Sequence, residues 1–217
     1  TKDIAVTQQV SFTTRLRMLF ADRATSKASI GILILCSVQN FGYYGLMIWM
    51  PSYLSSSFGF SLTKSGLWTA VTVVGMTFGI WLFGVLAARF ARWKLFLIYQ
   101  VGAVVMVIIY AQLRDPTLML FTGAVMGMFV NGMIGGYGAL ISDTYPLQVR
   151  ATAQTVLFNL GRGVGGFGPL VIGLCVSHWS FTAAITLLAL LYLLDIFATL
   201  FLLPKTQGSE DALGAIG

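Results

Sequence analysis

Charged residues are scarce in this sequence and make up only 9% of its 217 residues. A soluble domain usually carries about 25% charged residues and about 45–50% apolar ones. Here 57% of the residues are hydrophobic, which excludes an ordinary soluble domain. The composition predicts a polytopic membrane protein.

Cysteine, histidine and acidic residues are also few. Cys36 and Cys175 lie in apolar runs, so neither a disulfide framework nor a zinc site is indicated. The one histidine, His178, has no metal-ligand companions, and no serine or cysteine has a base at a plausible spacing. We therefore predict no enzyme activity, no catalytic residue, no metal and no cofactor. The net charge of +6 would suggest a nucleic-acid partner in a soluble chain, but in a membrane protein it indicates basic loops on one side.

What the sequence does contain is six long apolar runs. They cover Ala28–Tyr53, Ser65–Ala88, Leu95–Leu113, Thr117–Ser142, Thr152–Val176 and Phe181–Leu203. Because about 20 consecutive apolar residues cross a bilayer as one helix, we predict an all-α bundle of six membrane helices over residues 28–203. The six runs could form two inverted sets of three. Glycines gather in the fourth run and predict close helix packing, and Pro169 should kink the fifth.

The segments outside the runs are polar. Residues 1–27 predict a linker with a short amphipathic helix at the membrane surface, an ordinary linker being the alternative, and residues 204–217 predict a loose tail. With the N-terminus in the cytoplasm, only Lys64 and Arg114 lie outside. The inner side then holds Lys2, Arg15, Arg17, Arg23, Lys27, Arg89, Arg92, Lys94, Arg150 and Lys205. This asymmetry places both termini in the cytoplasm of a protein of the plasma (inner) membrane.

Arg162 is the most unusual residue of the apolar runs. An arginine near the middle of a span costs at least about 2.5–3.5 kcal/mol on insertion scales, so it should face protein or a wet cavity. It shares a helical stripe with Thr155, Asn159 and Gly166. The planar guanidinium suits a carboxylate. We expect Arg162 and Asn159 to bind an anionic substrate, and the alternative is a structural pair with an acid on another helix.

Asp195 in the sixth run is the acid that could form such a pair, and it shares a stripe with Tyr192 and Thr199. Buried acids in transporters often carry protons. Both roles remain open, and we favour the structural one because Asp195 lies towards the cytoplasmic end of its run.

Amide and phenol groups mark one further candidate surface. Gln39 and Tyr43 are four residues apart, as are Asn40 and Tyr44, so each pair shares a helix face. Polar groups in hydrocarbon need partners, so this face should meet a cavity or a neighbouring helix. Asn131 is the polar group of the fourth run. We expect all five to line a substrate cavity, with hydrogen bonding between helices as the alternative for the four residues of the first run.

Several motifs resemble those of a known family. Residues 40–51 read Asn-Phe-Gly-Tyr-Tyr-Gly-Leu-Met-Ile-Trp-Met-Pro. This run resembles the seventh helix of major facilitator superfamily carriers, in particular the aromatic acid:proton symporters and the niacin-transporter type. Residues 84–94 resemble the loop motif between the eighth and ninth helices, with Arg89 and Arg92 at its arginines and Ala88 in place of its aspartate.

The second half of the chain carries matching motifs. Asp143 and Arg150 resemble the acid and the arginine that flank the loop between the tenth and eleventh helices. Arg162 and Pro169 resemble the Arg-x-Gly and Pro pattern of the eleventh helix. Residues 204–208 read Pro-Lys-Thr-Gln-Gly, similar to a sugar-porter tail.

The resemblance covers nearly the whole chain but only the C-terminal half of such a carrier, so it implies a missing N-terminal six-helix half. It implies proton-coupled symport of a small organic anion, aromatic or monocarboxylic, across a lipid bilayer by alternating access. It also implies a cytoplasmic gate at Arg89, Asp143 and Arg150. A sugar or polyol carrier of the same superfamily remains an alternative, as does an oligomeric six-helix channel or membrane scaffold.

Overall fold

The structure is a computed structural model that describes residues 11–205. The first residues of the predicted linker and nearly all of the predicted tail lie outside the described residues. Within this range all regular secondary structure is helical. The helices are α1 (Phe12–Met18), α2 (Arg23–Phe58), α3 (Leu62–Ala87), α4 (Arg92–Gln112), α5 (Pro116–Gly132), α6 (Ile134–Thr144), α7 (Leu147–Gly165), α8 (Gly168–His178) and α9 (Phe181–Phe201).

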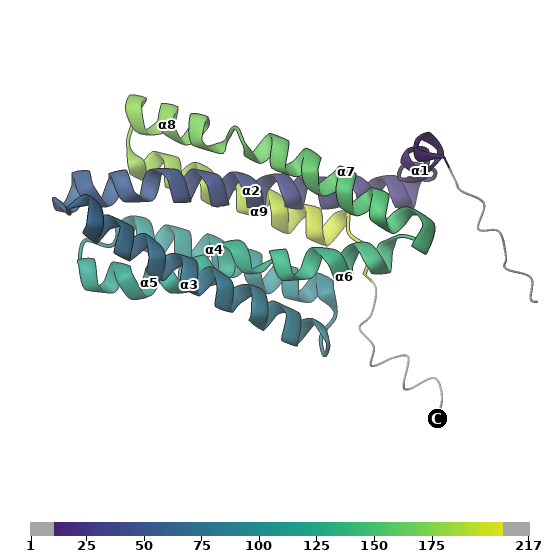
Figure 1. Cartoon of the computed structure of the whole chain (residues 1–217), viewed down its shortest axis with the longest axis horizontal. Coiled ribbons are helices and arrows are strands. Elements are labelled where there is room, and N and C mark those ends of the chain that lie inside the picture. The colour runs from purple at the N-terminus through teal and green to yellow at the C-terminus, as the bar shows by residue number, and fades with distance from the viewer. Residues whose placement is uncertain (1–10, 206–217) are drawn as a thin grey trace, which may run out of the picture.

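Six helical stretches in the described range are long and apolar enough to cross a membrane. Four are the single helices α2, α3, α4 and α9, and two are the interrupted pairs α5–α6 and α7–α8. The helices run nearly parallel along the long axis of the molecule (Figure 1). The predicted all-α bundle of six membrane helices is therefore confirmed.

Helix α2 is longer at both ends than the apolar run predicted. Its N-cap is Asp22, whose carboxylate accepts hydrogen bonds of 2.8 and 2.9 Å from backbone N–H groups of the first turn. Its C-cap is Gly59 at φ 65°, a left-handed conformation that glycine adopts without strain. Pro51 lies inside the helix rather than at its end. Capping residues, rather than hydrophobicity, thus set the ends of this helix.

The fourth and fifth spans are each interrupted. Helix α7 ends at Gly165 and α8 begins at Gly168, with Pro169 in the first turn of α8. A proline in the first turn lacks only an N–H that would be unsatisfied anyway, so the predicted kink takes the form of a helix break. The break at Met133 between α5 and α6 was not predicted, and there the N–H of Gly136 bonds to the Met133 carbonyl at 2.9 Å in a tighter turn.

The packing of the spans is symmetric under exchange of the first three with the last three. Helix α3 packs along α5 and α6, and α2 packs along α7 and α8. Exchange of the two sets converts the first pairing into the second. The pairing of α4 with α9 maps onto itself. These pairings are compatible with two inverted sets of three spans, the arrangement that the sequence left open.

Glycines allow α3 and α5 to approach closely. A Cβ atom at Gly75 would overlap the backbone carbonyl of Ala124, and one at Gly79 would overlap that of Met128. In return, a Cβ at Gly127 would overlap the carbonyl of Thr72. The glycine-rich fourth run therefore packs backbone to backbone against the second, as its composition predicted.

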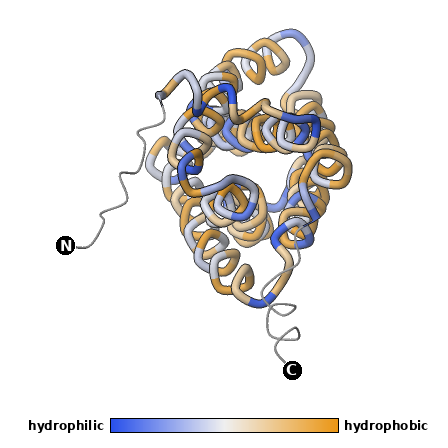
Figure 2. Tube along the Cα trace, turned by 90° about the vertical axis from the view of Figure 1, so that its right-hand side faces the viewer, coloured by the Kyte–Doolittle hydropathy of each residue, from blue (hydrophilic) through white to orange (hydrophobic). Residues whose placement is uncertain are grey.

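The end of the bundle at the α3–α4 and α6–α7 loops is called the basic end here. It carries Arg23, Arg89, Arg92, Lys94 and Arg150. Hydrophilic segments gather at this end, which faces the viewer in Figure 2. The other end of the bundle, at the α2–α3 and α8–α9 turns, is called the far end.

Helix α1 is attached to the basic end. It packs against α7, and Leu19 just after it is fully buried. The Ser29 hydroxyl donates to the Leu19 carbonyl at 2.6 Å and lies 2.6 Å from the Tyr145 hydroxyl in the α6–α7 loop. A short helix is thus present where the linker was expected, and its location at a membrane surface stays a prediction.

Candidate functional site

Arg162 lies close to the middle of the span Leu147–His178, and its side chain is exposed. Its Nη2 donates a hydrogen bond of 3.3 Å to the Tyr44 hydroxyl of α2. Asn159 lies one turn before it, also exposed, and its Nδ2 donates to the Thr155 carbonyl at 2.8 Å. Tyr43 packs edge-on against Tyr44, with ring centroids 5.3 Å apart. These five residues of α2 and α7 are called the polar face.

The polar face differs from the other exposed surfaces at the depth of the membrane. Those surfaces carry large apolar side chains, among them Val74, Phe78, Trp81, Ile98, Val105, Leu190 and Phe197. Apolar side chains are suited to lipid, whereas an exposed guanidinium near mid-span is not. The polar face is therefore a surface for water or for further protein, as the wall of a cavity would be.

Arg162 has hydrogen-bonding capacity left over. A guanidinium has five N–H donors, and one of them is directed at Tyr44. Within residues 11–205, Arg162 forms no ion pair. Asp195 is not its partner, because Asp195 is 0% exposed inside the bundle while Arg162 is exposed on α7. The favoured structural pair between these two residues is therefore wrong.

Three amides expected in the cavity lie inside the bundle instead. Gln39 is fully buried, and its Nε2 donates to Oδ1 of Asn131 at 3.2 Å, across α2 and α5. Asn40 is 5% exposed and its Nδ2 donates to the Cys36 carbonyl one turn earlier. An amide buried between helices is stabilised by bonding there, since an unsatisfied amide is costly. Gln39 and Asn131 thus form a hydrogen bond between helices, which was the alternative for Gln39.

The charged residues of the basic end pair differently from the expected gate. Asp143, in the last turn of α6, forms an ion pair with Arg92 at the start of α4. Arg150 instead donates from Nε to the Tyr145 carbonyl at 2.8 Å, and Arg89 is exposed in the α3–α4 loop. Both Arg89 and Arg92 belong to the sequence motif. Arg92 reaches Asp143 of α6 because it is the first residue of α4, whereas Arg89 lies in the preceding loop.

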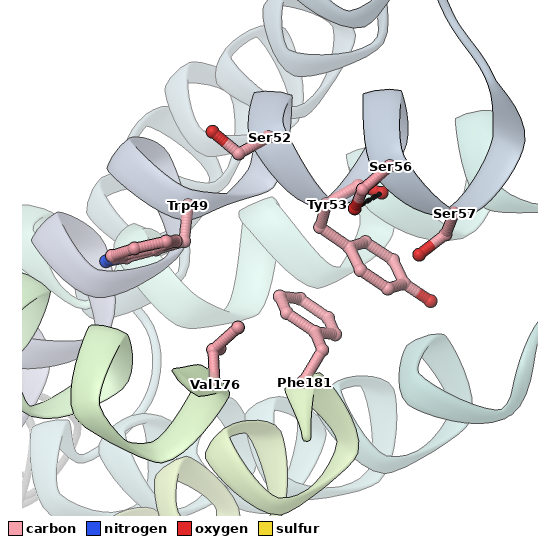
Figure 3. A pocket seen from close by; sticks show the side chains of 7 residues that line it. All are labelled: Trp49, Ser52, Tyr53, Ser56, Ser57, Val176 and Phe181. Atoms are coloured by element: carbon pink, nitrogen blue, oxygen red, sulfur yellow. Dashed lines mark hydrogen bonds between the residues drawn. The ribbon is translucent and has the colours of Figure 1, made fainter. Parts of the chain in front are cut away.

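A hollow of about 330 Å³ lies at the far end between α2, α8 and the start of α9 (Figure 3). Its lining consists of Trp49, Ser52, Tyr53, Ser56, Ser57, Val176 and Phe181. The ring of Tyr53 stacks on that of Phe181 at 3.6 Å, and Trp49 Nε1 donates to the Pro169 carbonyl at 2.8 Å. The hollow was not predicted. Its signal in the sequence was the spacing of Trp49, Tyr53 and Ser56 along one side of α2.

Comparison with known proteins agrees with this architecture. The family model described as the Major Facilitator Superfamily matches residues 11–215. A protein of Haemophilus influenzae, provisionally named a metabolite transport protein, is 59% identical over 95% of this chain and 52% of its own length. The cis,cis-muconate transport protein of Acinetobacter baylyi is 23% identical over 92% of this chain and 49% of its own length.

A third relative, from Bacillus subtilis, is provisionally named a niacin/nicotinamide transporter. It is 26% identical over 83% of this chain and 45% of its own length. The chain thus spans about half the length of the curated relatives it matches. The match to the family model includes every described helix, and we conclude that the chain belongs to the major facilitator superfamily, a family of membrane transporters and not of enzymes.

Proposed function

We propose that this chain is the C-terminal half of a secondary transporter that carries a small organic anion together with protons. Transport proceeds by alternating access, in which two six-helix halves rock about a site between them. The missing N-terminal half is the expected partner, because the relatives are about twice as long as the matched region. That half would cover the polar face and close the cavity.

The observation that carries this proposal is the exposed Arg162 near mid-span. Its guanidinium bonds to Tyr44 and has no acid partner in the described residues. A cargo carboxylate supplies the missing charge and accepts paired N–H donors. Two aromatic rings, Tyr43 and Tyr44, lie beside it and offer apolar contact to an aromatic or unsaturated acid. The relatives named for cis,cis-muconate and for niacin/nicotinamide support this class of cargo.

The sugar or polyol carrier rested on Gln39, Asn40 and the tail motif of residues 204–208. Both amides are hydrogen-bonded inside the bundle, which leaves only the tail motif in its favour. The channel or scaffold alternative requires a complete assembly of this chain alone. It gains no support from relatives that are about twice as long.

The test uses nicotinate and nicotinamide, which share a ring and differ in the carboxylate. Uptake of labelled nicotinate is measured in cells that express this chain together with its N-terminal half. Arg162→Lys keeps the positive charge but loses the planar pair of N–H donors with which a guanidinium binds both oxygens of a carboxylate. We expect the half-saturation concentration to rise by about tenfold or more, because a hydrogen bond to a charged group is worth about 1.5–3 kcal/mol.

Arg114→Lys is the matched control, since Arg114 lies in the α4–α5 loop at the far end. Unlabelled nicotinate should compete for uptake and nicotinamide should not. An unchanged half-saturation concentration in Arg162→Lys, or equal competition by nicotinamide, would show that Arg162 does not bind the cargo.

We propose further that the protein lies in the plasma membrane with its basic end on the cytoplasmic side. Asp143 with Arg92, together with Arg89 and Arg150, then forms the cytoplasmic gate. The two native cysteines are buried, so an introduced thiol reports its own side. Ser56→Cys at the far end and Lys94→Cys at the basic end should react with an impermeant reagent from opposite sides. Labelling from the same side would refute the proposed orientation.

A further inference from the structure

The interior of the bundle contains polar groups that the polar face does not use. Asp195 of α9 is 0% exposed, and in the described residues neither carboxyl oxygen has a hydrogen-bond partner. It interacts electrostatically with Cys36 of α2, Tyr137 of α6 and Tyr192 of α9. The hydroxyls of both tyrosines also lack partners there. These four residues, with Gln39, are called the inner polar cluster.

Gln39 belongs to this cluster by its place on α2. It lies one turn from Cys36 and one turn from Gly42, and a Cβ atom at Gly42 would overlap the Tyr192 hydroxyl. The Oε1 of Gln39 has no partner in the described residues, while its Nε2 bonds to Asn131. Gln39 therefore presents an acceptor without a donor on the face of α2 that also carries Cys36, and Cys36 interacts electrostatically with Asp195.

Among the residues that the structure describes, no cation balances the carboxyl group of Asp195. In residues 11–205 Asp195 forms no ion pair. The titratable groups around it are a thiol on α2, a phenol on α6 and a phenol on α9, all neutral in their ordinary form. From α4 the nearby polar group is Gln100, whose Nε2 bonds to Thr199 at 2.8 Å. Helix α8 packs near Ala184, about 16 Å from Asp195 along α9.

A carboxylate in such surroundings is unfavourable, because the loss of hydration is not offset by a charge or by donors. The protonated acid is neutral and therefore suits these surroundings better than the carboxylate does. When the O–H bond of Asp195 breaks, the proton passes to water, and the carboxylate that remains has no hydrogen bond from Tyr137 or Tyr192 in the described residues. The surroundings therefore favour the protonated acid.

We propose that Asp195 is a proton-binding site within this half, held by the inner polar cluster and reached through Gln39 and Asn131. Asn131 keeps 7% of its surface exposed, whereas Gln39 and Asp195 keep none, so this hydrogen-bonded pair leads from the interior of the bundle towards its surface. In the symport proposed above, this site would hold the transported proton. Only its use in transport rests on that proposal. It is separate from Arg162, which is exposed on α7.

Infrared spectroscopy of the chain in lipid vesicles tests the proposal without any transport. The chain has seven acidic residues, and ordinary carboxyls are ionised near neutral pH. We expect one carbonyl band of a protonated carboxylic acid near neutral pH. It should disappear in Asp195→Asn and persist in Asp143→Asn, the matched control at the basic end. The absence of the band in the folded chain, or its persistence in Asp195→Asn, would overturn the proposal.

Two further measurements address two complications: Asp195→Asn could fail to fold, and the Asp195 proton could be permanently bound. Carbon-13 labelling of aspartate in the unaltered chain should shift the band, and an unshifted band would exclude Asp195. Transfer into heavy water should shift the band as the proton exchanges, and Gln39→Leu should slow this exchange several-fold. A band that never exchanges would make Asp195 a structural acid. Proton-driven uptake without the band would leave the symport proposal standing and refute this site.

Discussion

The contact between α3 and α5 allows a prediction whose magnitude follows from the structure. Gly75→Ala adds one methyl group directly against the backbone carbonyl of Ala124. A side chain could turn aside, but a helix backbone can only move as a unit. Overpacking typically costs about 1–3 kcal/mol, and we expect a value near the upper end because the obstacle is backbone.

The matched control is Gly84→Ala in the same helix, where an added Cβ meets nothing within 4 Å. Both variants gain about 1 kcal/mol from helix propensity, so this contribution cancels in their difference. Gly75→Ala should therefore be less stable than Gly84→Ala by about 3 kcal/mol. In absolute terms it should lose about 2 kcal/mol relative to the unaltered chain.

The assay is the free energy of unfolding of the purified chain, measured by denaturant titration in mixed micelles with circular dichroism. A second pair, Gly79→Ala and Gly66→Ala, repeats the comparison on the same helix, since Gly79 faces the Met128 carbonyl and Gly66 faces open space. Equal unfolding free energies within each pair would refute the close packing of α3 on α5. The order of the spans in Figure 1 would then need revision.

Three further predictions concern the basic end. The pKa of Asp22 lies below its ordinary 3.8 because the N–H and hydroxyl of Thr25 donate to its carboxylate. Its cap should therefore be complete at neutral pH and lost only as the pH falls through the lowered pKa, and a carbon-13 titration showing an ordinary pKa would contradict this. Arg92→Gln should raise thiol labelling inside the proposed gate more than Arg89→Gln does, because Arg92 is ion-paired with Asp143, although a surface pair is worth only about 0–1 kcal/mol. Equal labelling of the two would leave the ion pair without a gating role. Tyr145→Phe removes one buried hydrogen bond, worth about 1 kcal/mol, and should speed proteolysis before α2, whereas an unchanged rate would show that this bond does not hold α1.

Local properties of the sequence were enough to predict the class of protein and the number of spans. Whether an apolar run of about 20 residues is long enough to cross a bilayer can be judged from the run itself, without knowing which helices surround it. Arg162 stood out for the same reason, because its cost in a span depends on its own side chain. The kink at Pro169 followed from the missing N–H of proline.

The ends and interruptions of the helices depended on finer signals. Helix α2 extends beyond its apolar run because Asp22 caps one end and Gly59 the other. These capping signals were present in the sequence, but a reading by hydrophobicity alone does not weigh them. The break at Met133 lies in a glycine-rich stretch that contains no proline, so the rule that anticipated the break at Pro169 does not anticipate this one.

Only the tertiary structure decided which polar groups meet. Helical spacing shows that Gln39 and Tyr43 share a face, but it does not show which helix covers that face. Gln39 is bonded to a residue 92 positions away, and Arg162 is bonded to one 118 positions away. Such pairings depend on how whole helices are arranged, because burial is a relation between neighbours and not a property of one side chain. For that reason the sequence alone determined that Asp195 lies in a membrane span, and the packing of α9 against α2 and α4 decided that it is buried, without a charged partner in the described residues.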